Sequence, residues 1–198
     1  MSNKPAPKKN GRIFVFSGPS GSGKTTLAQA VLSDKKFSGK LEKSVSFTTR
    51  PRRQGEKERR DYFFISEREF RRGLKAQKIL EWTRYLGYYY GTARDFVDNQ
   101  LGNSRSLILC LDLKGAARIK ELYPKNSTTI FIMPPSLEEL ARRIENRHRE
   151  TSREEIAKRL RLARKEMARA KDLDFCVVNA DLAQAVKELK KIIVKKIT

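Results

Sequence analysis

Eight residues near the start of the chain have the types and spacing of a phosphate-binding loop. The run Gly18-Pro19-Ser20-Gly21-Ser22-Gly23-Lys24-Thr25 fits the pattern G-x-x-x-x-G-K-[ST]. Glycines keep side chains out of the loop and allow positive φ, so that backbone N–H groups can converge on a polyphosphate. In this pattern the lysine bridges the β- and γ-phosphates, and the last hydroxyl ligates Mg²⁺. The loop therefore predicts phosphate chemistry centred on Lys24, with Mg²⁺ as the cofactor and Thr25 as its ligand.

The segments on either side of this loop fit the context that it requires. Residues 12–17 are mostly apolar and β-prone, and residues 26–32 have a helical pattern. A helix beginning near Lys24 would direct free N–H groups and the positive end of its dipole at the phosphates. The alternative is a glycine- and serine-rich loop that matches by chance, and the strand–loop–helix context argues against it.

A second cluster combines arginines with hydroxyl groups. In residues 44–56, Arg50, Arg52 and Arg53 lie close to serines and threonines, and the run Asp61-Tyr62-Phe63-Phe64 follows. Arginine forks match phosphate oxygens in bidentate geometry, and tyrosine hydroxyls can complete the shell. The cluster therefore predicts a second phosphate site. A solvated, arginine-rich turn is the alternative that this cluster alone leaves open.

Residues 80–92 combine a carboxylate, hydroxyl groups and several aromatic rings. A carboxylate such as Glu81 could accept two N–H bonds from one edge of a guanine, a donor pair that adenine lacks, and a hydroxyl could donate to guanine O6. The aromatic residues have a simpler interpretation as the core of a hairpin. We expect that role for Trp82, Tyr85 and at least one of Tyr88 and Tyr89.

Apolar runs and helical patterns alternate along the rest of the chain. Helical apolar faces cover Leu137 to Ile144, Ile156 to Ala170 and Leu182 to Ile193, and the pairs Ser66/Glu69, Ser136/Glu139 and Ser152/Glu155 predict capping boxes at helix starts. This alternation indicates an α/β fold with right-handed crossovers. The buried strands of its parallel sheet are expected at residues 13–16, 107–111, 129–133 and 175–178.

Two segments interrupt this alternation. Residues 41–93, with one short helix near 66–77, predict an inserted small α/β unit, and residues of about 138–172 predict a helical lid. The core would comprise 11–40, 94–137 and 173–198, after a disordered basic tail at 1–10. We therefore predict an α/β fold in which a three-layer phosphate-loop core with a parallel sheet carries the insert and the lid. The two attachments would close over the substrates and exclude water.

From about residue 11 to its end, the chain resembles the guanylate kinases. This resemblance implies transfer of the ATP γ-phosphoryl group to GMP or dGMP, giving ADP and GDP, with Mg²⁺. It rests on five motifs in family order: Gly-Pro-Ser-Gly-Ser-Gly-Lys-Thr-Thr, Ser-Val-Ser-Phe-Thr-Thr-Arg, Gly-Glu then Asp-Tyr-Phe-Phe, Leu-Glu-Trp with Gly-Tyr-Tyr-Tyr-Gly-Thr, and Val-Val-Asn.

The resemblance also implies roles for individual residues. The ATP site would comprise Gly18 to Thr25 together with Thr26 and Asn179. The GMP phosphate would be held by Ser46, Arg50, Arg53, Tyr62 and Tyr90, and guanine would be read by Glu81, Thr92 and Asp112. Arg143, Arg147 and Arg159 would come down from the lid over the ATP phosphates and act with Lys24 in catalysis.

The chain departs from the family pattern at several positions. Pro51 comes one place early and Arg52 fills the usual proline position, so Arg52 competes with Arg53 for the phosphate role. Cys110 stands at the first of two positions where the family often has aspartate. The lid loop after Arg147 is one residue longer than usual, which makes Arg149 an alternative to Arg147. His148 in this loop is expected to be exposed and not catalytic.

Composition limits the class of partner. The 198 residues include 44 Lys+Arg against 23 Asp+Glu, a net charge of +21, which suits nucleic acid, acidic membranes or phosphorylated small molecules. No nucleic-acid motif and no apolar run of the ~18–20 residues of a membrane span accompanies this charge. We therefore expect ATP and GMP as partners, no nucleic acid or membrane, and a monomer or homodimer. Cys110 and Cys176 lie in apolar, strand-like runs, which fits a reducing cytoplasm.

Three other functions are alternatives to a GMP kinase. A non-catalytic guanylate-kinase-like module that binds phosphopeptides is disfavoured by the intact Lys24 and Thr25. Another small-molecule kinase of the same fold is disfavoured by the Glu81 and Thr92 pair, which indicates a site for a base. A nucleic-acid-binding ATPase is favoured by the net charge alone.

Overall fold

The main sheet of the computed structural model has five parallel strands in the order β2-β7-β1-β8-β9. The structure describes residues 11–147 and 152–197. Four strands match the predicted apolar runs, and the fifth, β2, pairs with β7 at the edge of the sheet. The strands are β1 (Ile13–Ser17), β2 (Leu41–Lys43), β7 (Ser106–Cys110), β8 (Ser127–Met133) and β9 (Phe175–Val178).

Alternate side chains of β1 supply both layers of the core. Phe14 and Phe16 pack on one face with residues of α1 and α7, and Ile13 and Val15 pack on the other face with residues of α3 and α4. Successive strand residues point to opposite faces, so one apolar run serves two layers. This confirms the predicted α/β class. These helices are α1 (Lys24–Leu32), α3 (Arg94–Gly102), α4 (Leu113–Leu122) and α7 (Leu182–Ile197). No helix among the described residues is long and apolar enough to cross a membrane.

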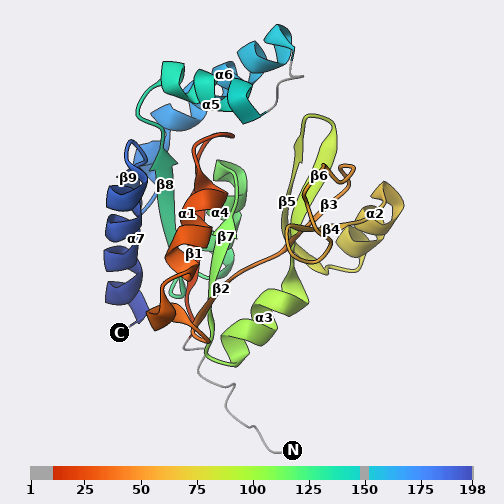
Figure 1. The fold of residues 1–198 in the computed structure, drawn as a ribbon. Helices are drawn as coiled ribbons and strands as arrows, with labels where there is room; N and C mark the ends of the chain where they lie inside the picture. The colour runs from red at the N-terminus through yellow and green to blue at the C-terminus, as the bar shows by residue number, and fades with distance from the viewer. Residues whose placement is uncertain (1–10, 148–151, 198) are drawn as a thin grey trace, which may run out of the picture.

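A second, four-stranded sheet stands beside the core, in the order β4-β3-β6-β5 (Figure 1). It lies within the segment predicted as an insert, but that segment starts too early at residue 41, because β2 belongs to the main sheet. Phe70 of α2 packs on this second sheet with Ile79 and Tyr89. Its elements are β3 (Ser46–Thr48), β4 (Tyr62–Phe64), α2 (Glu67–Lys75), β5 (Ile79–Tyr85) and β6 (Tyr88–Ala93).

Two helices, α5 (Leu137–Arg147) and α6 (Arg153–Ala168), form the segment predicted as a lid. They lie together above the main sheet in Figure 1 and pack through Leu140 and Ile144 of α5 and Ala163 of α6. Single-turn 3-10 helices complete the described elements at Lys35–Phe37 and Ala170–Asp172. The predictions for His148 and Arg149, and for residues 1–10, lie outside the described residues.

Serine hydroxyls cap all three helices for which capping boxes were predicted, but only one box is reciprocal. In α2, the Ser66 hydroxyl accepts from the Glu69 N–H, and the Glu69 carboxylate accepts from the Ser66 N–H. In α5 and α6, the serine accepts its backbone bond, but the glutamate three residues later pairs with an arginine one turn further on. A charge-assisted bond to arginine replaces the second half of the box there.

Four apolar or weakly polar side chains are more exposed than their patterns predicted, and one of them is Val178, which is 51% exposed at the end of β9. Trp82 is 41% exposed, because it lies on the edge strand β5, and Lys114 lies over its ring. Cys176 lies on the outward side of the edge strand β9, so burial at this position was a wrong prediction. Leu182, at the start of α7, is also exposed. Tyr89 is buried, as expected for a hairpin core.

Candidate active site

The loop between β1 and α1 has a conformation that requires glycine at two positions. Gly18 has φ +134°, and a Cβ there would lie 2.5 Å from the carbonyl oxygen of Ile132. Gly23 has φ +96°, and a Cβ there would lie 2.3 Å from the amide nitrogen of Asn179. Both distances are shorter than a methyl group tolerates, so backbone conformation and space each exclude a side chain. The loop is therefore held close to β8 and to the residue that follows β9.

Lys24 begins α1, and its side chain bends back over the loop. Its Nζ donates to the carbonyl oxygens of Gly18 at 2.5 Å and Pro19 at 2.9 Å. Thr25 and Thr26 follow in the first turn of the same helix. The ammonium group and the positive end of the helix dipole thus lie together at the loop, as phosphate binding requires.

Asn179 joins three parts of the site. Its side-chain amide donates to the carbonyl of Ser22 in the loop at 2.8 Å, and its own N–H donates to the carbonyl of Met133 at 2.8 Å. Its carbonyl oxygen accepts from Arg143 of the lid at 3.1 Å. Asn179 therefore links the phosphate loop, the end of β8 and α5, a set of contacts that its position in the sequence did not reveal.

Two of the predicted lid arginines face the same cavity as the loop. Arg143 donates to Glu139 at 2.8 Å, and Arg159, which is only 6% exposed, pairs with Glu155 one turn earlier in α6. Each guanidinium is thus held by a carboxylate of its own helix. The side chain of Arg147, the third predicted lid arginine, lies outside the described residues.

The carboxylate that holds Arg143 is strongly acidic. Hydrogen bonds from Arg142 and Arg143 lower the pKa of Glu139 to about 2. Glu139 therefore stays ionised throughout the neutral range and keeps Arg143 oriented.

An arginine cup lies on the insert. The Arg50 guanidinium is 7% exposed, donates to Glu56 at 2.6 Å, and lies 5.6 Å from the ring centroid of Tyr62. Tyr62 in turn meets Tyr90 edge to face. Arg53 lines the cavity, whereas Arg52 is not among its lining residues. Of these two competing arginines, the geometry therefore favours Arg53. Ser46 lines the cavity beside this cup.

Two carboxylates lie where β5 of the insert meets the start of α4. Glu81 is 5% exposed, and its Oε1 accepts from the Thr92 hydroxyl at 2.5 Å. Burial, opposed by the Thr92 hydrogen bond and reinforced by the charge of Asp112, raises the pKa of Glu81 to about 7. Asp112 caps α4 by accepting from the Gly115 N–H at 2.7 Å. Thr92 is fully buried, its hydroxyl donates to Glu81, and it is not among the residues that line the cavity, so its role in reading guanine stays a prediction.

One cavity of about 1420 Å³ connects all of these groups. Of the predicted site residues with described side chains, only Pro19, Ser22 and Thr92 are not among its lining. The predicted residues that the structure brings together around it are Gly18, Ser20, Gly21, Gly23, Lys24, Thr25, Thr26, Ser46, Arg50, Arg53, Tyr62, Glu81, Tyr90, Asp112, Arg143, Arg159 and Asn179.

Several further lining residues were missed from the sequence. Glu166 lies seven residues after Arg159, two turns along the same face of α6, and this spacing could have revealed it. Burial raises the pKa of its carboxyl group. Tyr85, from the β5–β6 hairpin, contacts Ser20 of the loop, and Lys43 lies in the unpredicted strand β2. The hairpin-core role predicted for Tyr85 is therefore wrong, and no motif or spacing marks Lys43.

A magnesium ion would find few protein ligands in this cavity. No group of three or more histidine, cysteine or acidic residues in the described part of the chain is arranged to hold a metal. The Thr25 hydroxyl lines the cavity in the first turn of α1. Mg²⁺ in nucleotide sites keeps several waters and binds substrate phosphates, with only one or two protein groups. The residues present fit this mode of binding, with Thr25 as the protein ligand.

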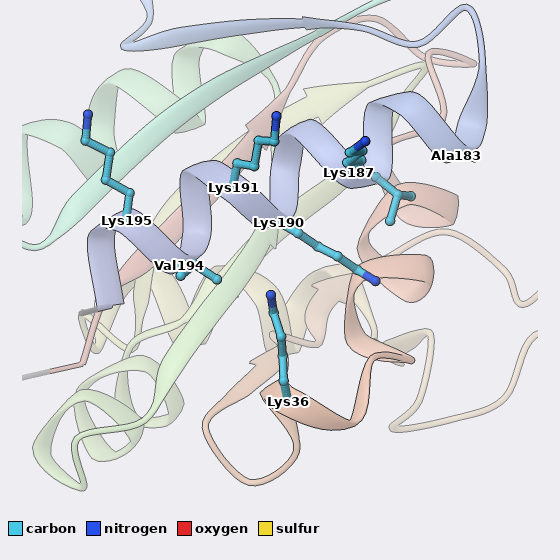
Figure 2. Close-up of a pocket in the computed structure, with 8 residues that line it drawn as sticks. Lys36, Ala183, Lys187, Lys190, Lys191, Val194 and Lys195 are labelled. Atoms are coloured by element: carbon cyan, nitrogen blue, oxygen red, sulfur yellow. The ribbon is translucent and has the colours of Figure 1, made fainter.

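A second cavity, of about 570 Å³, lies on the surface between α7 and Lys36 (Figure 2). Its lining is aliphatic except for lysines, and Lys190 pairs with Asp34 at 2.9 Å. It offers positive charge, but its lining residues include no hydroxyl, thiol, imidazole or carboxylate. The lining residues are Lys36, Ala183, Val186, Lys187, Lys190, Lys191, Val194 and Lys195.

The fold and the larger cavity define a phosphate-loop phosphotransferase, with the loop between a parallel strand and a helix and an arginine-lined cup opposite. A family model described as guanylate kinase matches residues 10–196. The guanylate kinase of Caldanaerobacter subterraneus is 41% identical over 94% of this chain and 88% of its own length, and that of Bartonella henselae is 38% identical over 97% and 84%. The crystal structure of guanylate kinase from Anaplasma phagocytophilum aligns with a TM-score of 0.77 at 32% identity, covering 94% of this chain and 86% of that one. The chain belongs to the guanylate kinase family.

Proposed function

We propose that the protein transfers the γ-phosphoryl group of ATP to GMP, giving ADP and GDP. The observation that carries this function is a single cavity containing the phosphate loop with Lys24, the Arg50 cup and the Glu81 carboxylate. A kinase that transfers a phosphoryl group between two nucleotides needs both phosphates in one site, and this cavity is lined by the phosphate loop and by the Arg50 cup. Membership of the guanylate kinase family supports the same reaction.

On the ATP side, the loop residues 18–25 cradle the polyphosphate with backbone N–H groups. Lys24 releases the carbonyls of Gly18 and Pro19 and pairs with the β- and γ-phosphate oxygens. Arg143 and Arg159 neutralise charge on the group in transit. The Thr25 hydroxyl would hold Mg²⁺, which would supply further charge neutralisation when bound.

On the GMP side, the acceptor needs to be positioned rather than activated. A phosphate monoester has a second pKa of about 6, so it is largely ionised near neutral pH and needs no general base. Arg50 and Arg53, with hydroxyls from Ser46, Tyr62 and Tyr90, would hold it in line with the γ-phosphorus. The phenol groups and the arginine fork all approach from the insert.

The guanine base would be read by two carboxylates. Ionised Glu81, oriented by Thr92, accepts the N–H groups along one edge of guanine, and Asp112 lies beside it at the start of α4. Adenine presents no such pair of donors, so AMP would leave part of the hydrogen-bonding capacity of the buried Glu81 carboxylate unused and is rejected. None of these proposed contacts involves the sugar, so we propose that dGMP is also a substrate. We further propose a cytoplasmic monomer or homodimer with no nucleic-acid or membrane partner.

A nucleotide panel tests this function. ADP release from Mg²⁺-ATP should depend on GMP or dGMP and be absent with AMP, CMP, UMP and RNA. Lys24→Ala should lower kcat on the order of 10³-fold, about 4 kcal/mol, with an unchanged circular dichroism spectrum. Wild-type protein that releases no ADP with GMP contradicts the function, and a Lys24→Ala variant with near-normal turnover contradicts the role of the lysine.

A further inference from the structure

Gly115, in the first turn of α4, contacts both carboxylates at the base end of the cavity. Its N–H donates to Oδ1 of Asp112 at 2.7 Å. A Cβ on Gly115 would lie 2.7 Å from Oε2 of Glu81 and 3.2 Å from Cβ of Leu111. The backbone of this one residue therefore lies against one oxygen of each carboxylate.

The backbone conformation does not explain why this position holds glycine. Gly115 lies inside a helix and is not among the residues with positive φ. Glycine is less favourable than alanine in a helix, so its presence here calls for a steric reason. That reason is the Glu81 carboxylate. By contrast, Gly102 at the end of α3 would place a Cβ in open space, with nothing within 4 Å.

Glu81 has little freedom to move away from an added methyl group. Its other oxygen, Oε1, accepts from the fully buried Thr92 hydroxyl at 2.5 Å. A Cβ at Gly115 would have to displace Oε2 by several tenths of an ångström, which either turns the carboxylate from the cavity or breaks the Thr92 bond. The Thr92 hydroxyl thus holds Oε1, and the absence of a side chain on Gly115 leaves the space that Oε2 occupies.

We propose that Gly115 is a positioning residue that sets the selectivity for guanine. Its N–H orients Asp112, and its missing side chain lets Glu81 approach α4, so that the two carboxylates face one base edge together. This inference rests on the proposed GMP kinase activity. It adds a residue that acts through Glu81 and contacts neither nucleotide.

The test is Gly115→Ala, compared with Gly102→Ala as a matched helical glycine. Misplacing a charged acceptor should raise KM for GMP about 10- to 100-fold, while KM for ATP changes less than about twofold. Gly102→Ala should change neither constant. An unchanged KM for GMP in Gly115→Ala overturns the proposal, and so does an equal rise in both KM values.

A double-mutant cycle with Glu81→Ala separates positioning from general damage. If Gly115 acts through Glu81, then Gly115→Ala should add no further rise in KM for GMP to the Glu81→Ala variant. An additive rise overturns the proposal. Should Gly115→Ala alone fail to fold, the double variant lacks the clashing carboxylate and should fold; if it also fails, the proposal is wrong. The wild-type nucleotide panel is independent of these variants, so failure of the GMP kinase activity itself is recognised separately.

Discussion

Glu81 shows how one buried side chain can combine recognition with a dependence on pH. Its carboxylate is almost fully removed from water and lies near a second carboxylate, Asp112. Both effects favour the protonated form and raise its pKa to about 7, while the Thr92 hydroxyl opposes them. Only the ionised form can accept two N–H bonds from guanine, so ligand binding and deprotonation are linked.

We predict that the affinity for GMP falls as the pH is lowered through about 7, the pKa of Glu81. One pH unit below this value, KM for GMP should be about tenfold above its plateau, because only about a tenth of the carboxylate is ionised. Steady-state kinetics at saturating ATP measure this profile. The GMP phosphate also titrates near pH 6, so Glu81→Gln serves as the control: it retains the phosphate titration and should lack the step near 7. Identical profiles for the two proteins contradict the assignment.

Helix α5 of the lid packs against the phosphate loop through apolar side chains. A Cβ on Gly21 would lie 3.1 Å from side-chain atoms of Leu140 and Ile144 of α5, so the loop packs directly against that helix. The same two residues join α5 to α6 through Ala163. The lid arginines therefore depend for their position on a small core of their own.

We predict that Ile144→Ala loosens this core and lowers kcat. Ile144 is buried, and truncating it should cost about 2–4 kcal/mol of unfolding free energy, felt first as faster amide hydrogen exchange in α5 and α6. Turnover should fall because Arg143, the preceding residue, loses its support. Ile197→Ala, at the exposed end of α7, is the matched control and should change stability by less than about 0.5 kcal/mol. Equal effects of the two substitutions contradict this role for the lid core.

Elements were predictable from the sequence where local pattern and tertiary context agree. β1 begins with four apolar residues and β8 ends with four, and both strands were located within one or two residues. β2 was missed because Leu41-Glu42-Lys43 is short and polar, and only its neighbour β7 makes it a strand. The exposure of Trp82 was missed for a related reason, since a sequence does not show that β5 is an edge strand.

The part of the site that could be predicted from the sequence is the part that is marked by motifs. The loop could be assigned from residue types, because phosphate binding requires glycine and lysine at close spacing, whereas the arginine cluster alone left a solvated turn open. The bond from Thr92 to Glu81 depends on how β6 pairs with β5, and the proximity of Gly115 to Glu81 depends on how α4 meets β5. No spacing along the chain encodes that contact.

On the scale of the whole molecule, positive charge is spread beyond the site. The chain has a net charge of +21, and several of its lysines line a surface groove on α7. None of the residues proposed for catalysis lies in this groove. We predict that Lys187→Glu with Lys191→Glu leaves kcat and both KM values within about twofold at physiological salt, where charges farther than about 8 Å are largely screened. Steady-state kinetics of this variant and of the wild type at 0.15 M salt make the comparison. A large loss of turnover would show that the groove serves the reaction.

Three of the four described arginines proposed to meet substrate phosphates have one arrangement in common. Arg50, Arg143 and Arg159 each pair with a glutamate within six residues along the chain. We therefore expect an incoming phosphate to displace the paired glutamate from each arginine. The glutamate would return to the arginine when the diphosphate product leaves. Such exchange lowers the net gain on binding and also the barrier to departure. This exchange should favour rapid product release and weaken inhibition by free inorganic phosphate.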